Sequence, residues 1–262
     1  AIGTVHTAQR LGPAVGPVIG GAIAGIVGLR RSFVVTAGLY AIGLFFAIFL
    51  YDERAIRAPA HSENGKRTVR FADVIALEHF VVLMVVIFVA QFADRSFGPI
   101  LPLYLEQIGV RHDDVPVAAG IVFSVAALAG ATGHHLCGKL LERYRASAVI
   151  SLGAVAASVG SILIAVVPNV WLMSLATIFF GLGVGISMTA SYAVAASVIP
   201  PGTHGAGFGV LTSASLVGMA VSPVAAGALG GLSLRAVFVV DGVLMAAPFF
   251  VVRRFMVANN GT

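Results

Sequence analysis

The chain has 262 residues, of which 58% are hydrophobic and only 10% are charged, with a formal net charge of +5. Soluble domains carry roughly 25% charged residues, so this composition indicates an integral membrane protein. The basic residues are scattered between apolar stretches and do not line one face, which argues against a nucleic-acid-binding protein. The single cysteine, Cys137, excludes an intramolecular disulfide and a cysteine-rich metal site.

The first apolar stretch carries glycine and proline at a regular spacing. Gly12, Gly16 and Gly20 recur every four residues, and Pro13 and Pro17 each follow one position later. Both residue types are poor helix formers in water, but a helix in a bilayer tolerates them where neighbouring helices support it. Because a glycine ridge lets a second helix approach closely, we predict a transmembrane helix with a close-packing face.

Apolar segments of about 20 residues, the length that crosses a bilayer, recur along the whole chain. We predict eight spanning helices, at 4–29, 33–51, 79–104, 115–138, 147–167, 170–198, 205–231 and 235–252. Their connections are short, except for a polar segment at 52–78 that carries both basic and acidic residues. We interpret this segment as a linker between two helical bundles, with a surface helix at 71–77.

Lysine and arginine in the loops predict the orientation, because cytoplasmic loops carry the excess of both. The richer set of alternating loops holds Arg54, Arg57, Lys66, Arg67, Arg70, Lys139, Arg143, Arg145, Arg253 and Arg254. The opposite set holds Arg30, Arg31, Arg111 and Arg235. The linker and the C-terminus are therefore predicted to be cytoplasmic, in a multi-pass protein of the inner (plasma) membrane.

A weak internal repeat relates the first and seventh predicted helices. Gly3, Gly12, Pro17 and Gly21 align with Gly209, Gly218, Pro223 and Gly227. An offset of six helices preserves orientation, so the repeat indicates parallel six-helix halves, as in transporters whose halves are related by an axis along the membrane normal. The alternative is a chance similarity between two glycine-rich helices.

The glycine and proline positions resemble a motif of the major facilitator superfamily, and within it of the twelve-helix drug:proton antiporters. Gly12, Gly16, Pro17, Gly20 and Gly21 are similar to the antiporter motif on the family's fifth helix. The segment Pro99-Ile-Leu-Pro-Leu-Tyr104 also resembles the outer end of the family's seventh helix.

A second resemblance lies after the fourth predicted helix. Gly138, Glu142 and Arg143 match positions in the second copy of the family's cytoplasmic loop motif. The family usually has aspartate where this chain has Glu142, and glycine where it has Tyr144. Glu142 and Arg143 keep the acid–base pair of the motif, whereas Tyr144 lacks the conformational freedom that the glycine gives to the tight turn.

The resemblance extends from the fifth to the twelfth helix of the family. It implies an all-α integral membrane fold, with eight helices of an expected twelve that form two parallel six-helix halves. Residues 1–51 would hold the last two helices of the N-terminal half, 52–78 the cytoplasmic linker, and 79–262 the C-terminal half. The chain is then expected to be a fragment of a longer protein that is monomeric when complete.

Two charged residues fall inside the third predicted span. A charge there costs ~2.5–3.5 kcal/mol on insertion scales, so it usually faces a water-filled cavity or a partner. Gln91, Asp94, Arg95 and Gly98 follow helical spacing and share one face. We expect this face to line a central cavity, with Asp94 as the proton or cation carrier and Arg95 as its charge partner. A structural ion pair is the alternative.

Four other polar residues lie in predicted spans. Arg10 could handle substrate or protons, or extend toward the inner surface along its aliphatic stem. His134 and His135 are expected at the cytoplasmic membrane edge, and Asp241 is expected to make a polar contact with a neighbouring helix. No metal site is predicted, because no carboxylate lies at ligand spacing from the histidines.

Three apolar or aromatic residues are candidates for weak substrate contacts, with ordinary packing as the alternative: Met188, Tyr192 and Phe208. Four small residues of the fourth span are expected to pack against the glycine ridge of the first: Ser124, Ala127, Gly130 and Gly133.

The resemblance implies proton-coupled efflux of small drug-like or amphipathic molecules by alternating access, with the lipid bilayer and the substrate as partners. The proton would be the coupling ion and no other cofactor is expected. An enzyme is not expected, because the spans contain no His-Glu-x-x-His motif and no obvious paired-aspartate or Ser-Lys arrangement. The alternatives are a proton symporter or facilitator for sugars or metabolites, and a non-transporting membrane subunit.

Overall fold

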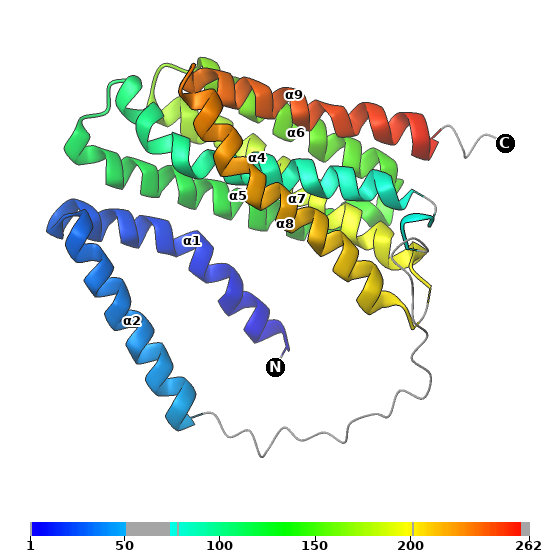
Figure 1. The fold of residues 1–262 in the computed structure, drawn as a ribbon, viewed down its shortest axis with the longest axis horizontal. Coiled ribbons are helices and arrows are strands. Elements are labelled where there is room, and N and C mark those ends of the chain that lie inside the picture. Colours follow the sequence, from blue (N-terminus) through cyan, green and yellow to red (C-terminus); the bar gives the residue numbers. More distant parts are fainter. Residues whose placement is uncertain (1, 51–73, 78, 201, 258–262) are drawn as a thin grey trace.

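The computed structural model describes residues 2–50, 74–77, 79–200 and 202–257, and its regular elements within these ranges are helices (Figure 1). The long helices are α1 (Ile2–Val27), α2 (Leu29–Leu50), α4 (Phe80–Gln107), α5 (Val115–Arg143), α6 (Ala146–Val166), α7 (Val170–Val198), α8 (His204–Gly230) and α9 (Leu234–Val252). A short 3₁₀ turn, His112–Asp114, precedes α5, and a π turn, Arg253–Val257, follows α9.

These helices match the eight predicted spans within a few residues at each end. Seven of them contain a stretch that is long and apolar enough to cross a membrane. In α1 an apolar stretch is found at Val15–Val27, within the described residues. The predicted linker lies almost entirely outside the described residues, as do residues 71–73 of the predicted surface helix; Val74 is buried in a single helical turn.

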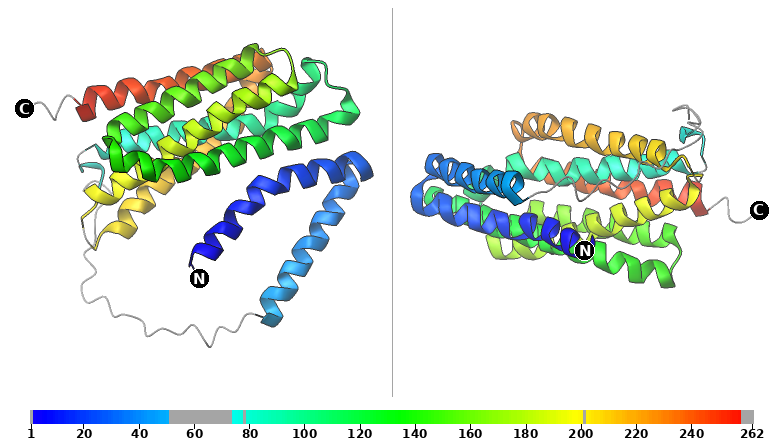
Figure 2. Two further views of the ribbon diagram at one scale, coloured as in Figure 1. Left: turned by 180° about the vertical axis from the view of Figure 1, so that it is seen from behind. Right: turned by 90° about the horizontal axis from the view of Figure 1, so that it is seen from below.

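Helices α4 to α9 pack side by side into a bundle, and α1 and α2 form a hairpin against one side of it (Figures 1 and 2). Between α1 and α2, Gly28 adopts a φ of 85°. Glycine reaches this left-handed conformation without strain, which lets α1 end and the chain reverse into α2. The hairpin meets the bundle through α1, which lies along α5.

Glycines bring the helices of the bundle to backbone contact. On α7, a Cβ at Gly181 would collide with the carbonyl oxygen of Ala126 on α5, and one at Gly183 would collide with the backbone of Gly153 on α6. Alternate glycines of α7 therefore face different neighbours. Close approach of this kind is a main source of helix association in lipid, where no hydrophobic effect operates between helices.

Buried hydroxyl groups add hydrogen bonds between the helices. Ser158 and Ser161 on α6 donate to the carbonyl oxygens of Gly242 and Phe238 on α9, over 2.7 and 2.8 Å. Tyr104 on α4 donates to α6 in the same way, over 2.9 Å to the carbonyl oxygen of Ile164. These hydrogen bonds satisfy polar groups inside the bundle without the help of water.

The predicted contact between the first and fourth spans is confirmed at the level of helices, but a different row of α1 residues makes it. A Cβ at Gly21 would collide with the carbonyl oxygen of Pro116, and one at Gly120 would collide with that of Pro17. Val18 N donates to Ser124 Oγ over 3.1 Å. The contact row of α1 is therefore the one that holds Pro17 and Gly21.

The predicted ridge of Gly12, Gly16 and Gly20 does not make this contact. A Cβ at any of the three would meet no atom of the described residues within 4 Å. This row lies one residue, or about 100°, around the helix from the contact row. Two of the small residues expected to pack against it, Gly130 and Gly133, contact α7 instead.

Candidate functional site

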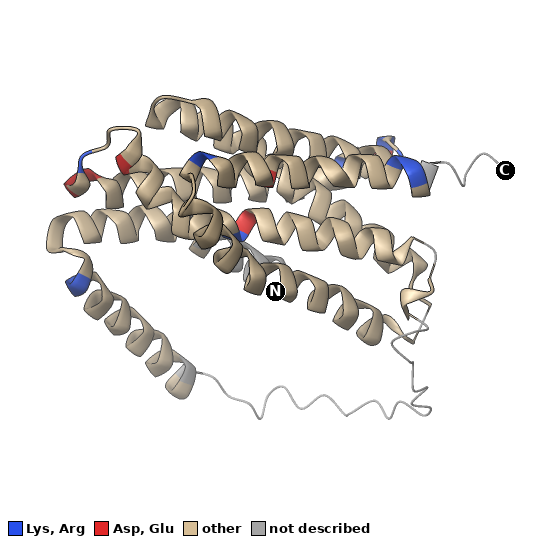
Figure 3. Ribbon diagram, turned by 45° about the horizontal axis from the view of Figure 1, so that its top comes forward, with Lys and Arg blue, Asp and Glu red and all other residues tan. Residues whose placement is uncertain are grey.

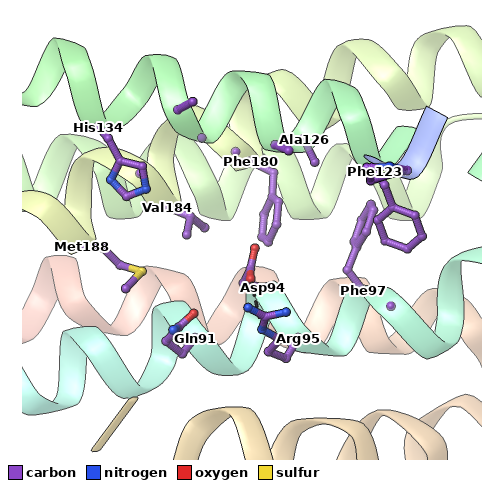
Figure 4. A pocket seen from close by; sticks show the side chains of 17 residues that line it. Gln91, Asp94, Arg95, Phe97, Phe123, Ala126, His134, Phe180, Val184 and Met188 are labelled. Carbon is purple, nitrogen blue, oxygen red and sulfur yellow. Dashed lines mark ion pairs between the residues drawn. The ribbon is translucent and has the colours of Figure 1, made fainter. Parts of the chain in front are cut away.

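A cavity of about 660 Å³ lies between α1, α4, α5 and α7 (Figure 4). Its walls are formed by Pro17, Gln91, Asp94, Arg95, Phe97, Gly98, Phe123, Ala126, Ala127, Gly130, Ala131, His134, Phe180, Gly181, Val184, Gly185 and Met188. The glycines and alanines of α5 and α7 leave this space open, because their side chains do not fill it. A volume of this size suits a drug-sized molecule.

The charged wall of the cavity is one face of α4. Gln91, Asp94, Arg95 and Gly98 all line it, where helical spacing placed them. Arg95 Nε lies 3.6 Å from Asp94 Oδ2, and the two side chains are 51% and 42% exposed (Figure 4). The pair therefore faces the open space of the cavity, where an intramembrane charge avoids contact with lipid.

Gln91 is positioned by α8. Its Nε2 donates to Ser215 Oγ over 2.9 Å and lies 3.7 Å from Met219 Sδ. This anchor fixes the amide at the edge of the cavity, next to the charged pair. The predicted roles of these α4 residues in coupling or binding stay predictions.

The cavity wall also has an aromatic part, to which α4, α5 and α7 each contribute one phenyl ring. The ring of Phe97 lies 5.8 Å from that of Phe180, nearly parallel to it, and 5.9 Å from that of Phe123, edge to face. Asp94 points from α4 toward Phe180 on α7 (Figure 4). A carboxylate thus stands beside three phenyl rings in one cavity.

These three aromatic residues were not among the predicted site residues. The position of Phe97 in the cavity could have been predicted, because Phe97 lies three residues after Asp94 and therefore near the same helical face. The positions of Phe123 and Phe180 could not have been predicted, because the direction of their side chains depends on how α5 and α7 are rotated in the bundle.

The two histidines near the end of α5 differ in their surroundings, and their predicted place at the membrane edge stays a prediction. His134 lines the cavity, with Nδ1 2.5 Å from Thr189 Oγ1 on α7. It lies nine residues before the end of α5 at Arg143, or about 13 Å along the helix. His135, the next residue, is exposed and is not among the residues that line the cavity.

The candidate substrate contacts separate into two groups. Met188 lines the cavity, but Tyr192 and Phe208 are not among its lining residues. The rings of Tyr192 and Phe208 stack on each other at 6.3 Å, between α7 and α8. Arg10 lies in α1, but its side chain is outside the described residues.

The residues similar to the cytoplasmic loop motif lie in the last two turns of α5. Gly138, Glu142 and Arg143 are all exposed there. The helix ends at Tyr144 in an extended conformation, with φ −128° and ψ 154°. Since this conformation is open to any residue, the turn does not require the glycine that the family usually has at this position.

Asp241 lies outside the cavity, on the other side of α4. It is 2% exposed, and Ser96 Oγ hydrogen-bonds to its Oδ2. The predicted polar contact with a neighbouring helix is confirmed.

A second cavity, of about 770 Å³, lies beyond the first, toward the turn between α1 and α2. Pro17 and Phe123 line both cavities, so the two cavities are adjacent. Glu106 and His112 line the second cavity, with Glu106 Oε1 2.6 Å from His112 Nδ1.

Comparison with known proteins agrees with this architecture. The model of the Major Facilitator Superfamily matches residues 1–147 and 83–261. A multi-drug resistance efflux pump PmrA homolog from Lactococcus lactis is 23% identical over 91% of this chain and 59% of its own length. The multidrug resistance protein MdtG is 28% identical in Proteus mirabilis and 30% identical in Escherichia coli, over 63% and 58% of this chain.

The chain spans only part of the length of these relatives, 59% of the first and 41% and 38% of the two MdtG proteins. The family match nevertheless covers nearly all of the chain, and the helical bundle with its central cavity agrees with it. The chain belongs to the Major Facilitator Superfamily.

Proposed function

We propose that the protein exports small amphipathic molecules across the membrane in exchange for protons, by alternating access. The observation that carries the proposal is the central cavity, which is lined by both the Asp94–Arg95 pair and three phenyl rings. The names of the relatives, an efflux pump and multidrug resistance proteins, favour export over uptake.

In this proposal Asp94 carries the coupling proton. Its carboxylate is the one acidic group among the described residues that line the central cavity, and Arg95 lies within ion-pair distance of it. Protonation of Asp94 would release Arg95 and remove the negative charge that a cationic substrate needs. Substrate and proton would then compete for one carboxylate, which is the requirement for exchange.

The aromatic wall would bind the apolar part of the substrate. Phe97, Phe123 and Phe180 offer ring faces, and Met188 offers a flexible thioether that adapts to different shapes. Gln91 would supply a hydrogen-bonding group beside them. Such a site binds by apolar contact with few directional bonds, which favours a broad range of substrates.

The close contact between α1 and α5 would act as the pivot for alternating access. At Gly21 and Gly120 the backbones of the two helices are in direct contact. No side chains interlock at these glycines, so the two helices can rock against each other. Phe123 would close the central cavity from the second one in this conformation.

The proposal also covers the cofactor, the oligomeric state and the location of the protein. The protein would act as a carrier and not as an enzyme, with the proton as its coupling ion and no other cofactor. It would work as a monomer in the inner (plasma) membrane, with the linker and the C-terminus in the cytoplasm.

The test is transport by the protein expressed from its complete coding sequence and reconstituted in vesicles. The probe is ethidium, an amphipathic aromatic cation. We expect ethidium to move against its gradient when a proton gradient is imposed, and to stop when an uncoupler collapses that gradient. Movement only down the ethidium gradient would favour a facilitator, and binding without movement would favour a non-transporting subunit.

A further inference from the structure

A second carboxylate of the bundle, Asp241 on α9, is not used by the proposed mechanism. Its side chain is 2% exposed, and it does not line either cavity. Its contact in the described part of the chain is with Ser96 on α4, which is itself fully buried. Ser96 is two residues from Asp94 and therefore projects from a different face of α4.

The surroundings of Asp241 offer no positive charge to balance an ionised carboxylate. Among the described residues, no ion pair involves Asp241. Helix α6 contains no titratable residue, and α8 contains only His204, at its first position. On α4, Asp94 and Arg95 pair with each other at the cavity, and on α9 the other charge is Arg235, near its start. An unpaired buried carboxylate is strongly disfavoured, so the neutral acid is the form that fits.

The hydrogen bonds of Ser96 also favour the neutral form of the Asp241 carboxyl. Ser96 Oγ lies 2.9 Å from the carbonyl oxygen of Ala93 and also contacts Asp241 Oδ2. A serine hydroxyl has one proton to donate. If that proton goes to the Ala93 carbonyl, which can only accept, the proton between Ser96 and Asp241 must come from Asp241. A neutral Asp241 thus satisfies both contacts at once.

The position of Ser96 along α4 links this carboxyl to helix movement. Pro99 and Pro102 lie just beyond Ser96 and have no N–H, so the carbonyl oxygens of Arg95 and Gly98 lose their helical hydrogen bonds. Ser96 therefore lies where α4 can bend.

The parts of α4 before and after the bend are held by different helices. Before the bend, Phe92 O accepts a hydrogen bond from Ser222 on α8, over 2.6 Å. Beyond it, Tyr104 donates to the carbonyl oxygen of Ile164 on α6. Asp241 is fixed on α9, whose next residue, Gly242, accepts from Ser158 of α6. A change in the bend would thus move Ser96 relative to Asp241.

We propose that Asp241 is a second proton-binding site, occupied while Ser96 contacts it and emptied when bending of α4 separates the two. On binding, the proton forms the O–H bond of the Asp241 carboxyl and is shared with Ser96 Oγ; on release it goes to water that enters between α4 and α9. The release step rests on the proposed transport cycle, whereas the occupied state does not.

Infrared spectroscopy of the protein expressed from its complete coding sequence tests the occupied state. At neutral pH we expect a C=O band of a protonated carboxylic acid that is lost in Asp241→Asn. Ser96→Ala keeps the carboxyl but removes its hydrogen-bond partner, and should shift the band to higher frequency. Asp114→Asn, which alters an exposed ion pair outside both proton sites, is the matched control and should leave the band in place.

The outcomes separate this inference from the proposed function. A spectrum that is the same in this region for the wild type and Asp241→Asn would overturn the inference, even if proton-driven ethidium export is observed. A band that is lost in Asp241→Asn would support the inference, even if export is absent. Should Asp241→Asn fail to fold, a band that does not move in Ser96→Ala would also count against it.

Discussion

Asp94 is the residue on which the proposed coupling depends. Asp94→Asn keeps the size of the side chain and its hydrogen-bonding capacity but removes the proton site and the charge opposite Arg95. We expect ethidium export driven by a proton gradient to be lost, while exchange of ethidium between the two sides continues. The measurement is ethidium movement in vesicles with and without an imposed proton gradient.

The matched control is Asp114→Asn. Asp114 also pairs with a neighbouring arginine, Arg111, over 3.7 Å, but both side chains are exposed at the turn before α5. This variant should export as the wild type does. Proton-driven export by Asp94→Asn at the wild-type level would exclude Asp94 as the carrier.

The residues of the cavity differ in how far sequence could locate them. Asp94, Arg95 and Gln91 could be placed, because intramembrane polarity and helical spacing together define one face of one helix. His134 could not, because its distance from the end of its helix depends on where α5 stops, and α5 continues to Arg143. Phe180 could not either, because the sequence of α7 is apolar apart from small hydroxyl residues and has no charged face to set its rotation.

At the scale of helices, the α1–α5 contact depends on a single row of small residues. Gly21→Leu would place a side chain where the carbonyl oxygen of Pro116 lies. Overpacking of this kind costs typically ~1–3 kcal/mol and forces the backbones apart. We therefore expect α1 to separate from α5.

Disulfide trapping measures this separation. Val18→Cys and Ser124→Cys replace two residues whose backbone nitrogen and hydroxyl are 3.1 Å apart, and Cys137→Ala removes the native thiol. The pair should cross-link readily on its own and much less when Gly21→Leu is added. Gly16→Leu is the control and should leave the yield unchanged, because a Cβ there meets no described atom within 4 Å. Equal loss of cross-linking in both variants would contradict the assignment of the contact row.

The helices themselves were the most predictable part of the fold. A run of about 20 apolar residues is enough to define a span, and short polar connections such as Pro168-Asn169 define its ends. At that connection, Asn169 Oδ1 accepts from Leu172 N over 2.9 Å and begins α7. The choice between glycine rows of α1 was not predictable, because both rows are small enough for close packing and only the neighbouring helix distinguishes them.

At the scale of the molecule, charge gathers at the two ends of the bundle (Figure 3). The end near the C-terminus holds Lys139, Arg143, Arg145, Arg253 and Arg254. The other end holds Arg30, Arg31, Arg111 and Arg235. These counts, five and four, are nearly balanced. The five basic residues of segment 52–78 decide the predicted orientation, since that segment leads into the start of α4 at the end near the C-terminus.

Labelling of single cysteines with a membrane-impermeant maleimide tests that orientation. In a Cys137→Ala background, Asp113→Cys probes the turn before α5 and Phe255→Cys probes the end after α9; both positions are exposed. Neither substitution changes a lysine or arginine, so the charges that set the orientation are kept. In spheroplasts with an intact inner membrane we expect Asp113→Cys to be labelled at once, and Phe255→Cys only after the membrane is permeabilised. The reverse pattern would place the linker outside the cell. The basic residues of the short loops would then set the orientation, and those of the linker would not.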